Sequence, residues 1–79
     1  MEKRMPLREG KASATYVIET MNLPLKTEKR LQALGLTKGT KVYILNRKRR
    51  GTMIVQIRGT RFAFGYGITK NIQVKEVTN

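Results

Sequence analysis

The chain has 79 residues and carries 17 Lys and Arg against five acidic residues, which gives a formal net charge of +12. A chain of this length supports one hydrophobic core, so we expect a single domain. The sequence contains no Cys and no His, which excludes disulfide bonds, the usual zinc sites and imidazole catalysis. The positive charge attracts anionic partners, which include nucleic acid, anionic lipid and an acidic protein face.

The N-terminal part of the chain predicts a short loose segment followed by a strand. Residues 1–5 show no structural pattern, and Pro6 with Leu7 is the first expected anchor, so the domain is expected to span residues 6–77, with 78–79 frayed. Residues 12–21 are rich in Thr, Tyr, Val and Ile, which favours a strand. No apolar run long enough to span a bilayer and no secretory signal are visible, so we expect a cytoplasmic protein.

A short helix with a glycine stop is predicted next, from about residue 25 to 34. Leu31 and Leu34 are spaced i, i+3 on one apolar stripe. Gly35 stands where helices commonly end in a left-handed residue, and Leu36 can then fold back onto the last turn. Gly39 marks a tight turn into the following strand.

Three further strands are predicted to form a meander. The apolar run from Val42 to Leu45 favours a strand covered on both faces, and residues 52–59 alternate at the strand period. In residues 61–67 the alternation places three aromatic side chains on one face, which favours core packing over a base-stacking platform. These aromatic residues are Phe62, Phe64 and Tyr66.

The C-terminal part leaves room for one helical turn at residues 68–71, before a last strand at 72–77. Five short strands and one helix cannot cover both faces of an open sheet in so small a chain. We therefore expect a mainly β fold, a five-stranded SH3-like or OB-like barrel with one short helix.

The sharpest charge feature is the run Arg47, Lys48, Arg49 and Arg50, at the expected tip of the hairpin. Such a tip grips phosphates in RNA-binding barrels. It is equally typical of a solvated loop that prevents aggregation. Residue types alone leave both interpretations open.

Catalysis and metal binding find little support in the sequence. The five Glu are scattered and never fall within one helical turn of another, so no acid-base pair or ligand set is indicated. The glycines do not complete a phosphate-binding loop and fit turns instead. We expect a binding module with no cofactor, not an enzyme.

The segment "RLQALGLTKGTKV" at residues 30–42 resembles the RL..LGL..G..V pattern of the FeoA family of small ferrous iron transport accessory proteins. The resemblance extends through "VQIRGTRFAFGYGITKNIQV" to the last strand and begins at "PLREGK", so it covers about residues 6 to 77. It implies an SH3-like barrel in the bacterial cytoplasm. It also implies a partner, FeoB, the membrane ferrous transporter that carries a GTPase domain.

We derive three hypotheses about binding. In the first, the chain docks on FeoB through an apolar rim of Leu23, Leu25, Leu31 and Leu34, with Arg30 and the 47–50 run steering electrostatically. The charge also suits an anionic membrane face. In the second, an RNA or the ribosome is bound by cations that contact phosphates, namely Arg47, Lys48, Arg49, Arg50, Arg58 and Arg61.

In the third, Arg30 or the 47–50 run supplies an arginine finger to a GTPase. The oligomeric state is left open, because exposed strand edges can pair with a second copy unless the charge prevents it.

Overall fold

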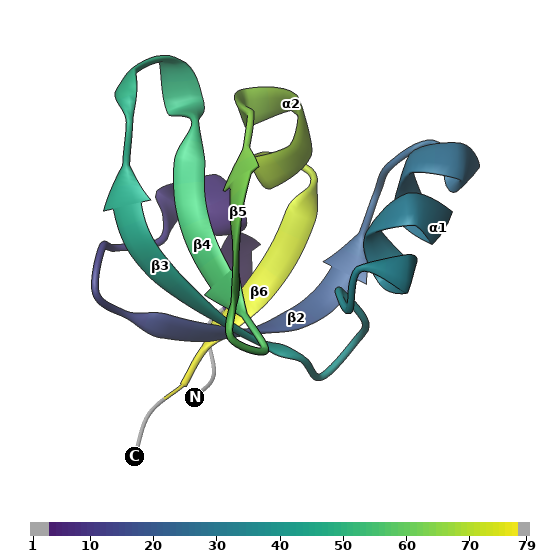
Figure 1. The fold of residues 1–79 in the computed structure, drawn as a ribbon, viewed down its shortest axis with the longest axis horizontal. Helices are drawn as coiled ribbons and strands as arrows, with labels where there is room; N and C mark the ends of the chain where they lie inside the picture. Colours follow the sequence, from purple (N-terminus) through teal and green to yellow (C-terminus); the bar gives the residue numbers. More distant parts are fainter. Residues whose placement is uncertain (1–3, 78–79) are drawn as a thin grey trace.

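The computed structural model describes residues 4–77 as one twisted antiparallel sheet with an α-helix standing beside it (Figure 1). The elements follow in chain order: β1 (Arg4–Pro6), the 3-10 turn η1 (Leu7–Glu9), β2 (Thr15–Met21), α1 (Leu25–Ala33), β3 (Lys41–Arg47), the 3-10 turn η2 (Arg49–Gly51), β4 (Met53–Ile57), β5 (Thr60–Phe64), α2 (Tyr66–Thr69) and β6 (Ile72–Glu76).

The sheet has six strands in the order β1-β6-β2-β3-β4-β5 and does not close. The predicted five-stranded barrel is therefore corrected to an open six-stranded sheet, in which β1 and β5 are the two edges of the described chain. The additional strand is β1, where Arg4 pairs with Lys75 and Met5 with Val74. Arg4 and Met5 thus belong to the fold. The expectations for residues 1–3 and 78–79 lie outside the described residues.

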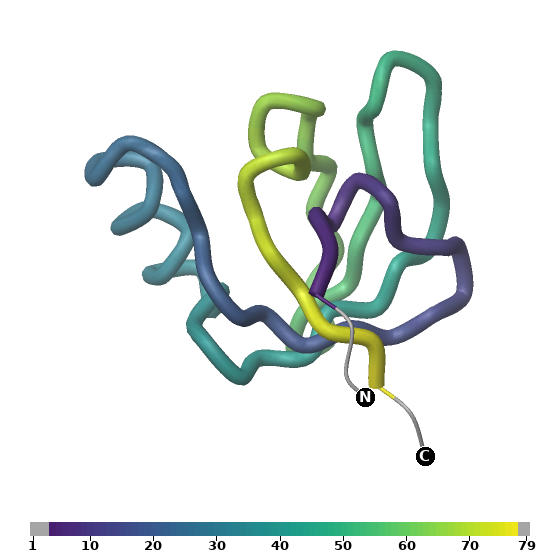
Figure 2. Tube along the Cα trace, turned by 180° about the vertical axis from the view of Figure 1, so that it is seen from behind, coloured from purple at the N-terminus to yellow at the C-terminus, as the bar shows by residue number. Residues whose placement is uncertain are grey.

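The first and last described strands lie side by side, because β1 and β6 are antiparallel neighbours (Figure 2). β6 also pairs with β2, where Val17 lies opposite Lys75 and Ile18 opposite Val74. The last strand is therefore enclosed between β1 and β2. This arrangement makes residues far apart in the sequence direct neighbours in the sheet.

The strand pattern of β3 differs from the prediction. Val42 and Ile44 are completely buried, whereas Tyr43 between them is 37% exposed. The strand is therefore covered on one face only, and the apolar run is interrupted by outward-facing positions. In β4 the predicted alternation is found, because Met53, Val55 and Ile57 are all buried.

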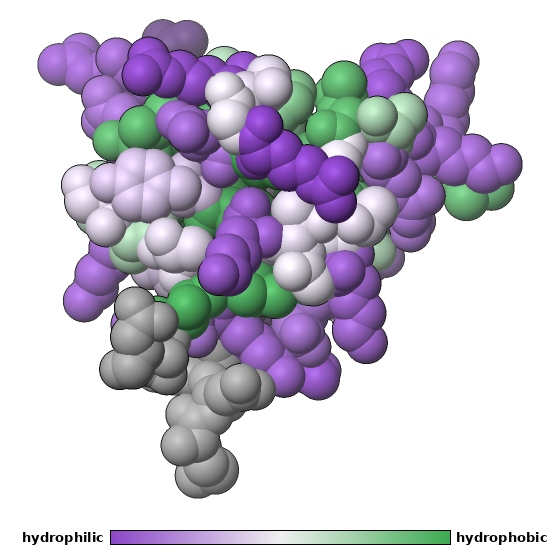
Figure 3. All heavy atoms as spheres, turned by 60° about the horizontal axis from the view of Figure 1, so that its bottom comes forward, coloured by the Kyte–Doolittle hydropathy of each residue, from purple (hydrophilic) through white to green (hydrophobic). Residues whose placement is uncertain are grey.

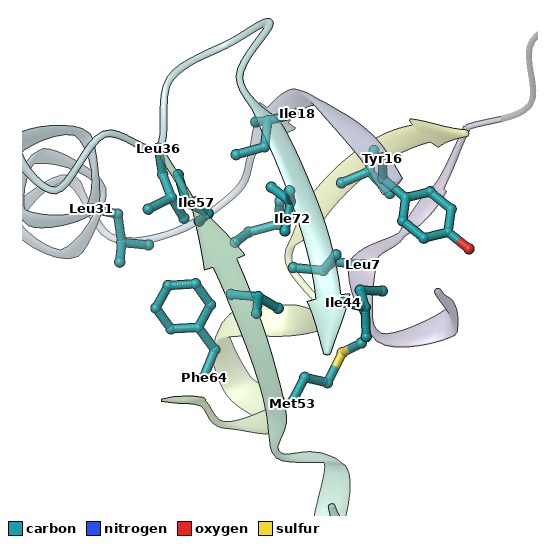
Figure 4. Packing of buried hydrophobic residues seen from close by; sticks show 13 residues of the cluster. Leu7, Tyr16, Ile18, Leu31, Leu36, Ile44, Met53, Ile57, Phe64 and Ile72 are labelled. Atoms are coloured by element: carbon teal, nitrogen blue, oxygen red, sulfur yellow. The ribbon is translucent and has the colours of Figure 1, made fainter. Parts of the chain in front are cut away.

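One continuous core is formed by the inward faces of the strands (Figure 4). Leu31 from α1 and Leu36 from the following loop extend this core toward the helix. Hydrophilic side chains cover much of the face seen in Figure 3, with apolar atoms visible between them. The buried cluster comprises Leu7, Tyr16, Ile18, Leu31, Leu36, Val42, Ile44, Met53, Val55, Ile57, Phe64, Ile72 and Val74.

The segment after β4 corrects the predicted position of Tyr66. Phe64 is buried and stacks on the partly buried Phe62, with 5.6 Å between ring centroids. The strand ends there, because Gly65 begins the helical turn α2 at Tyr66 instead of at residue 68. Tyr66 is consequently 45% exposed and does not join the core.

Candidate interaction site

The tip of the β3-β4 hairpin is held in a fixed shape by backbone bonds. The Lys48 N–H donates to the Thr52 carbonyl at 2.7 Å. Arg50 has a φ of +64°, a left-handed conformation that tightens the turn η2. All four cations of the predicted run, Arg47, Lys48, Arg49 and Arg50, are exposed. The run is thus a folded, solvent-facing turn.

This tip is connected to two other segments of the chain. The Arg47 Nη2 atom donates to the Arg8 carbonyl at 2.9 Å. Helix α2 contacts both η1 and η2. Residues separated by more than 35 positions in the sequence therefore form one end of the molecule.

Tyr66 lies at the centre of this end. The Arg8 guanidinium carbon is 5.6 Å from the centroid of its ring, and the Lys70 Nζ atom is 5.3 Å from it. Each contact is a cation-π interaction, which contributes about 0.5–1 kcal/mol at an exposed site. We call this surface the cationic end, and it comprises Arg8, Arg47, Lys48, Arg49, Arg50, Tyr66 and Lys70.

The charge around the cationic end is strongly one-sided. No Asp or Glu occurs in the sequence between Glu28 and Glu76, so β3, β4, β5 and α2 carry no acidic side chain. At this end Glu9 lies 3.7 Å from the Arg8 guanidinium. Glu19 lies on β2, where it contacts Arg4 at 3.4 Å. The positive field is therefore little compensated at the cationic end.

The four leucines of the predicted rim do not form one surface. Leu31 is 5% exposed and belongs to the core, and Leu23 is partly buried against it. This corrects the rim, because the i, i+3 stripe faces inward at Leu31. Leu25 and Leu34 are 66% and 48% exposed. They stand nine positions apart, which at about 100° per residue places them on opposite sides of α1.

Helix α1 nevertheless leaves two leucines exposed on different sides, Leu25 at its first residue and Leu34 directly after its last. Arg30 is also exposed. Its side chain has no hydrogen bond or ion pair with any residue from 4 to 77. The ribbon of α1 lies to one side of the sheet (Figure 1), and Leu31 joins the helix to the core (Figure 4).

The two glycines after α1 adopt left-handed conformations, with φ of +106° at Gly35 and +89° at Gly39. The Leu36 N–H donates to the Leu31 carbonyl and the Gly35 N–H to the Gln32 carbonyl, each at 3.0 Å. This pair of bonds is a Schellman motif. The Gly39 N–H donates a hydrogen bond to the Ile18 carbonyl at 2.8 Å. The junction is therefore attached to β2 and fixes where α1 leaves the sheet.

The cations of the RNA-binding hypothesis are divided by the fold. Arg58 lies in the β4-β5 turn and Arg61 on β5, next to the Ile57 end of β4. The 47–50 run precedes the Met53 end of the same strand. Five residues of β-strand span about 17 Å. Arg58 and Arg61 therefore lie outside the cationic end.

Three members of the cationic end, Arg8, Tyr66 and Lys70, were not predicted from the sequence to lie together. Their proximity arises from packing between η1, η2 and α2, which leaves no local sequence pattern.

Among residues 4–77 no cluster of three or more metal-ligating side chains occurs. No helix in this range is long and apolar enough to cross a membrane. The side chains described at the site offer charged, aromatic and apolar contacts.

Comparisons with known structures agree on the fold. The chain resembles an iron uptake regulatory protein, FeoA, with a TM-score of 0.85, 24% identity, and coverage of 95% of this chain and 100% of that chain. It also resembles a manganese-dependent transcriptional repressor, with a TM-score of 0.86, 14% identity, and coverage of 98% of this chain and 44% of that chain. Identities this low establish a shared fold alone.

The zinc complex of FeoA from Stenotrophomonas maltophilia, described as an SH3 domain protein, matches at a TM-score of 0.75 and 29% identity. It covers 89% of this chain and 88% of that chain. No curated protein matches the sequence. The model of the FeoA domain matches residues 5–76, which is nearly the whole chain. The chain therefore belongs to the FeoA domain family, which is associated with ferrous iron transport.

Proposed function

We propose that this chain is a non-enzymatic accessory protein of ferrous iron transport that acts in the cytoplasm by binding the GTPase region of a FeoB-type transporter. The S. maltophilia relative is a candidate ferrous iron transport activating factor. The observation that carries the proposal here is the exposure of two leucines at the two ends of α1, Leu25 and Leu34. Large apolar side chains left in solvent suit docking on a protein partner.

The cationic end supports the same proposal through electrostatics. Its side chains come from three segments and have little acidic compensation. Such a surface accelerates encounter with an acidic partner. It also favours approach to the anionic inner face of a membrane, where each nearby Lys or Arg contributes about 1 kcal/mol.

Calorimetric titration with the cytoplasmic region of a FeoB-type transporter tests the proposal. We expect the chain to bind and the double variant Leu25→Ala, Leu34→Ala to bind more weakly, because the variant removes two apolar contacts with the partner. The variant should stay folded, because these exposed side chains contribute little to the core. Lys48→Glu at the cationic end should slow association. Lys38→Glu changes the same charge at the opposite end of β3 and serves as its control. Absence of binding at low salt contradicts the proposal.

GTP turnover in the same mixtures distinguishes regulation from assembly. If the chain donates an arginine finger, turnover rises steeply and Arg30→Lys or Arg49→Lys abolishes the rise. If the chain assembles the transporter only, turnover stays unchanged while binding persists.

A second candidate function, RNA binding, is favoured by the exposed ring of Tyr66 and the two cations next to it. Aromatic faces and phosphate-binding cations occur together in single-strand binders. Fluorescence polarisation with a short single-stranded RNA should then show affinity that falls steeply with salt. Lack of binding near 50 mM salt, a condition under which such contacts are strong, excludes this function.

A further inference from the structure

The free edge of β5 carries backbone groups without partners. β5 pairs with β4 alone, and its other side is an edge of the described sheet. The connecting turn has two residues, Arg58 and Gly59, with φ of +51° and +80°. Two-residue turns with positive φ at both positions close the hairpin on a hydrogen-bonded pair. That pair is Ile57 with Thr60.

Hydrogen-bonded and non-bonded pairs alternate along an antiparallel ladder. Phe62 and Phe64 are therefore bonded to β4, whereas Arg61 and Ala63, which lie between them, direct their N–H and C=O groups away from it. No backbone bond from another part of residues 4–77 reaches Arg61 or Ala63. The edge thus offers two donors and two acceptors in a row.

Solvent reaches this edge. Arg61 and Ala63 are both exposed. Alanine has only a methyl group beyond its Cα, so Ala63 adds little bulk beside the edge. The opposite edge, β1, is only three residues long and contains Pro6, which has no N–H to donate. β5 is therefore the better edge for pairing.

The charge around β5 determines which strand fits. Arg58 and Arg61 flank the edge, and no acidic residue lies on β3, β4, β5 or α2. The side chain of Arg58 lies near the end of α1, because a Cβ at Gly35 would be 3.5 Å from its Cδ. A second copy of the chain would bring a charge of +12 against +12, which opposes self-pairing.

We propose that the β5 edge binds an extended acidic segment of a partner protein, which adds a seventh strand to the sheet. The segment pairs its backbone with Arg61 and Ala63, and its carboxylates face Arg58 and Arg61. This mode of binding is independent of the transporter proposal, because any extended acidic segment satisfies it. If the peptide does not bind to β5, the transporter proposal is unaffected, and the reverse also holds.

The test uses the full chain and labelled ten-residue peptides in fluorescence polarisation. The probe alternates valine and glutamate, and a second peptide replaces glutamate by lysine. A third peptide keeps every glutamate but replaces the valines by proline, so it has the charge but cannot form a strand. We expect binding of the first peptide only. Equal binding of the proline peptide overturns the proposal, since attraction would then be charge alone.

A variant of one edge residue tests the site. Ala63→Pro removes an N–H that the fold does not use. It should lower the affinity for the acidic peptide about tenfold, because the complex loses one hydrogen bond and gains a steric clash. Ala63→Val keeps the N–H and should bind within about twofold of the original chain. Unchanged affinity of a folded Ala63→Pro variant refutes the assignment.

Two further measurements keep the proposal testable if Ala63→Pro unfolds. Amide exchange of the original chain should slow at Arg61 and Ala63 when the acidic peptide is saturating, and unchanged exchange there counts against pairing. Sedimentation of the free chain should show a monomer. A dimer whose formation protects the same two amides would show that a second copy occupies the edge, which also overturns the proposal.

Discussion

The backbone of Gly51 lies directly against the side chain of Tyr66, so that a Cβ at residue 51 would come within 2.7 Å of the Tyr66 Cβ atom. This contact joins the tip of the β3-β4 hairpin to α2. It keeps the basic run beside the tyrosine ring, and the cationic end depends on it.

We predict that Gly51→Ala destabilises the fold more than Gly59→Ala. Both glycines have left-handed φ, +79° and +80°, but nothing lies within 4 Å of a Cβ at Gly59. Gly59→Ala should therefore cost about 1 kcal/mol for backbone strain alone, and Gly51→Ala about 1–3 kcal/mol more for overpacking. Urea unfolding measures both free energies. Equal costs would show that the contact with Tyr66 relaxes freely.

Gly35→Ala should lower the free energy of unfolding by about 1–2 kcal/mol, because φ at Gly35 is +106°. The new methyl group would have ordinary contact distance, 3.5 Å, to Arg58, so the backbone alone accounts for the loss. Gly67→Ala is the control. Gly67 lies inside α2 with open space around it, and alanine there should stabilise by about 0.5–1 kcal/mol. A Gly35→Ala melting curve like that of the original chain contradicts the left-handed cap.

Tyr16→Phe should destabilise the fold by about 1 kcal/mol, the usual contribution of one hydrogen bond. The Tyr16 hydroxyl oxygen accepts a bond from the Lys11 N–H at 2.8 Å, and Tyr16 is 2% exposed. The same change at Tyr43, which faces solvent, should be neutral. Thermal unfolding followed by circular dichroism compares the two, and equal shifts would mean that the hydroxyl of Tyr16 contributes nothing.

Glu19→Gln should destabilise the fold by about 1–2 kcal/mol, because it removes a poorly screened carboxylate that pairs with two cations. The Glu19 Oε1 atom lies 3.4 Å from Arg4 and 3.5 Å from Lys75. Its side chain is only 12% exposed, so water screens the charge poorly. Glu9→Gln removes the exposed pair with Arg8 and should cost less than about 0.5 kcal/mol. Urea unfolding at low salt measures the free energy of unfolding of both variants. Similar losses for Glu19→Gln and Glu9→Gln would contradict the stronger contribution of Glu19.

Local patterns in the sequence predict local structure well. The end of α1 is an example, because Leu31, Gly35 and Leu36 form a motif within six residues, and its hydrogen bonds lie inside that span. The alternation of Met53, Val55 and Ile57 similarly predicts the buried face of β4.

Features that depend on distant contacts were not predictable. β1 forms because Arg4 and Met5 meet β6 near the other end of the chain, and a three-residue strand has no pattern of its own. The exposure of Tyr66 follows from the end of β5 at Phe64, and its approach to Arg8 depends on tertiary packing. The rim of four leucines was wrong at Leu31 because apolar spacing does not distinguish a residue that docks on the core from one that faces a partner.

The pairing of β1 with β6 has a consequence for how this fold can be used. Since Arg4 lies opposite Lys75, the chain enters and leaves the domain at nearly the same point (Figure 2). A unit with adjacent ends can be inserted into a surface loop of another protein without stretching either linker. We therefore expect this domain to remain folded when it is inserted between two parts of a carrier protein.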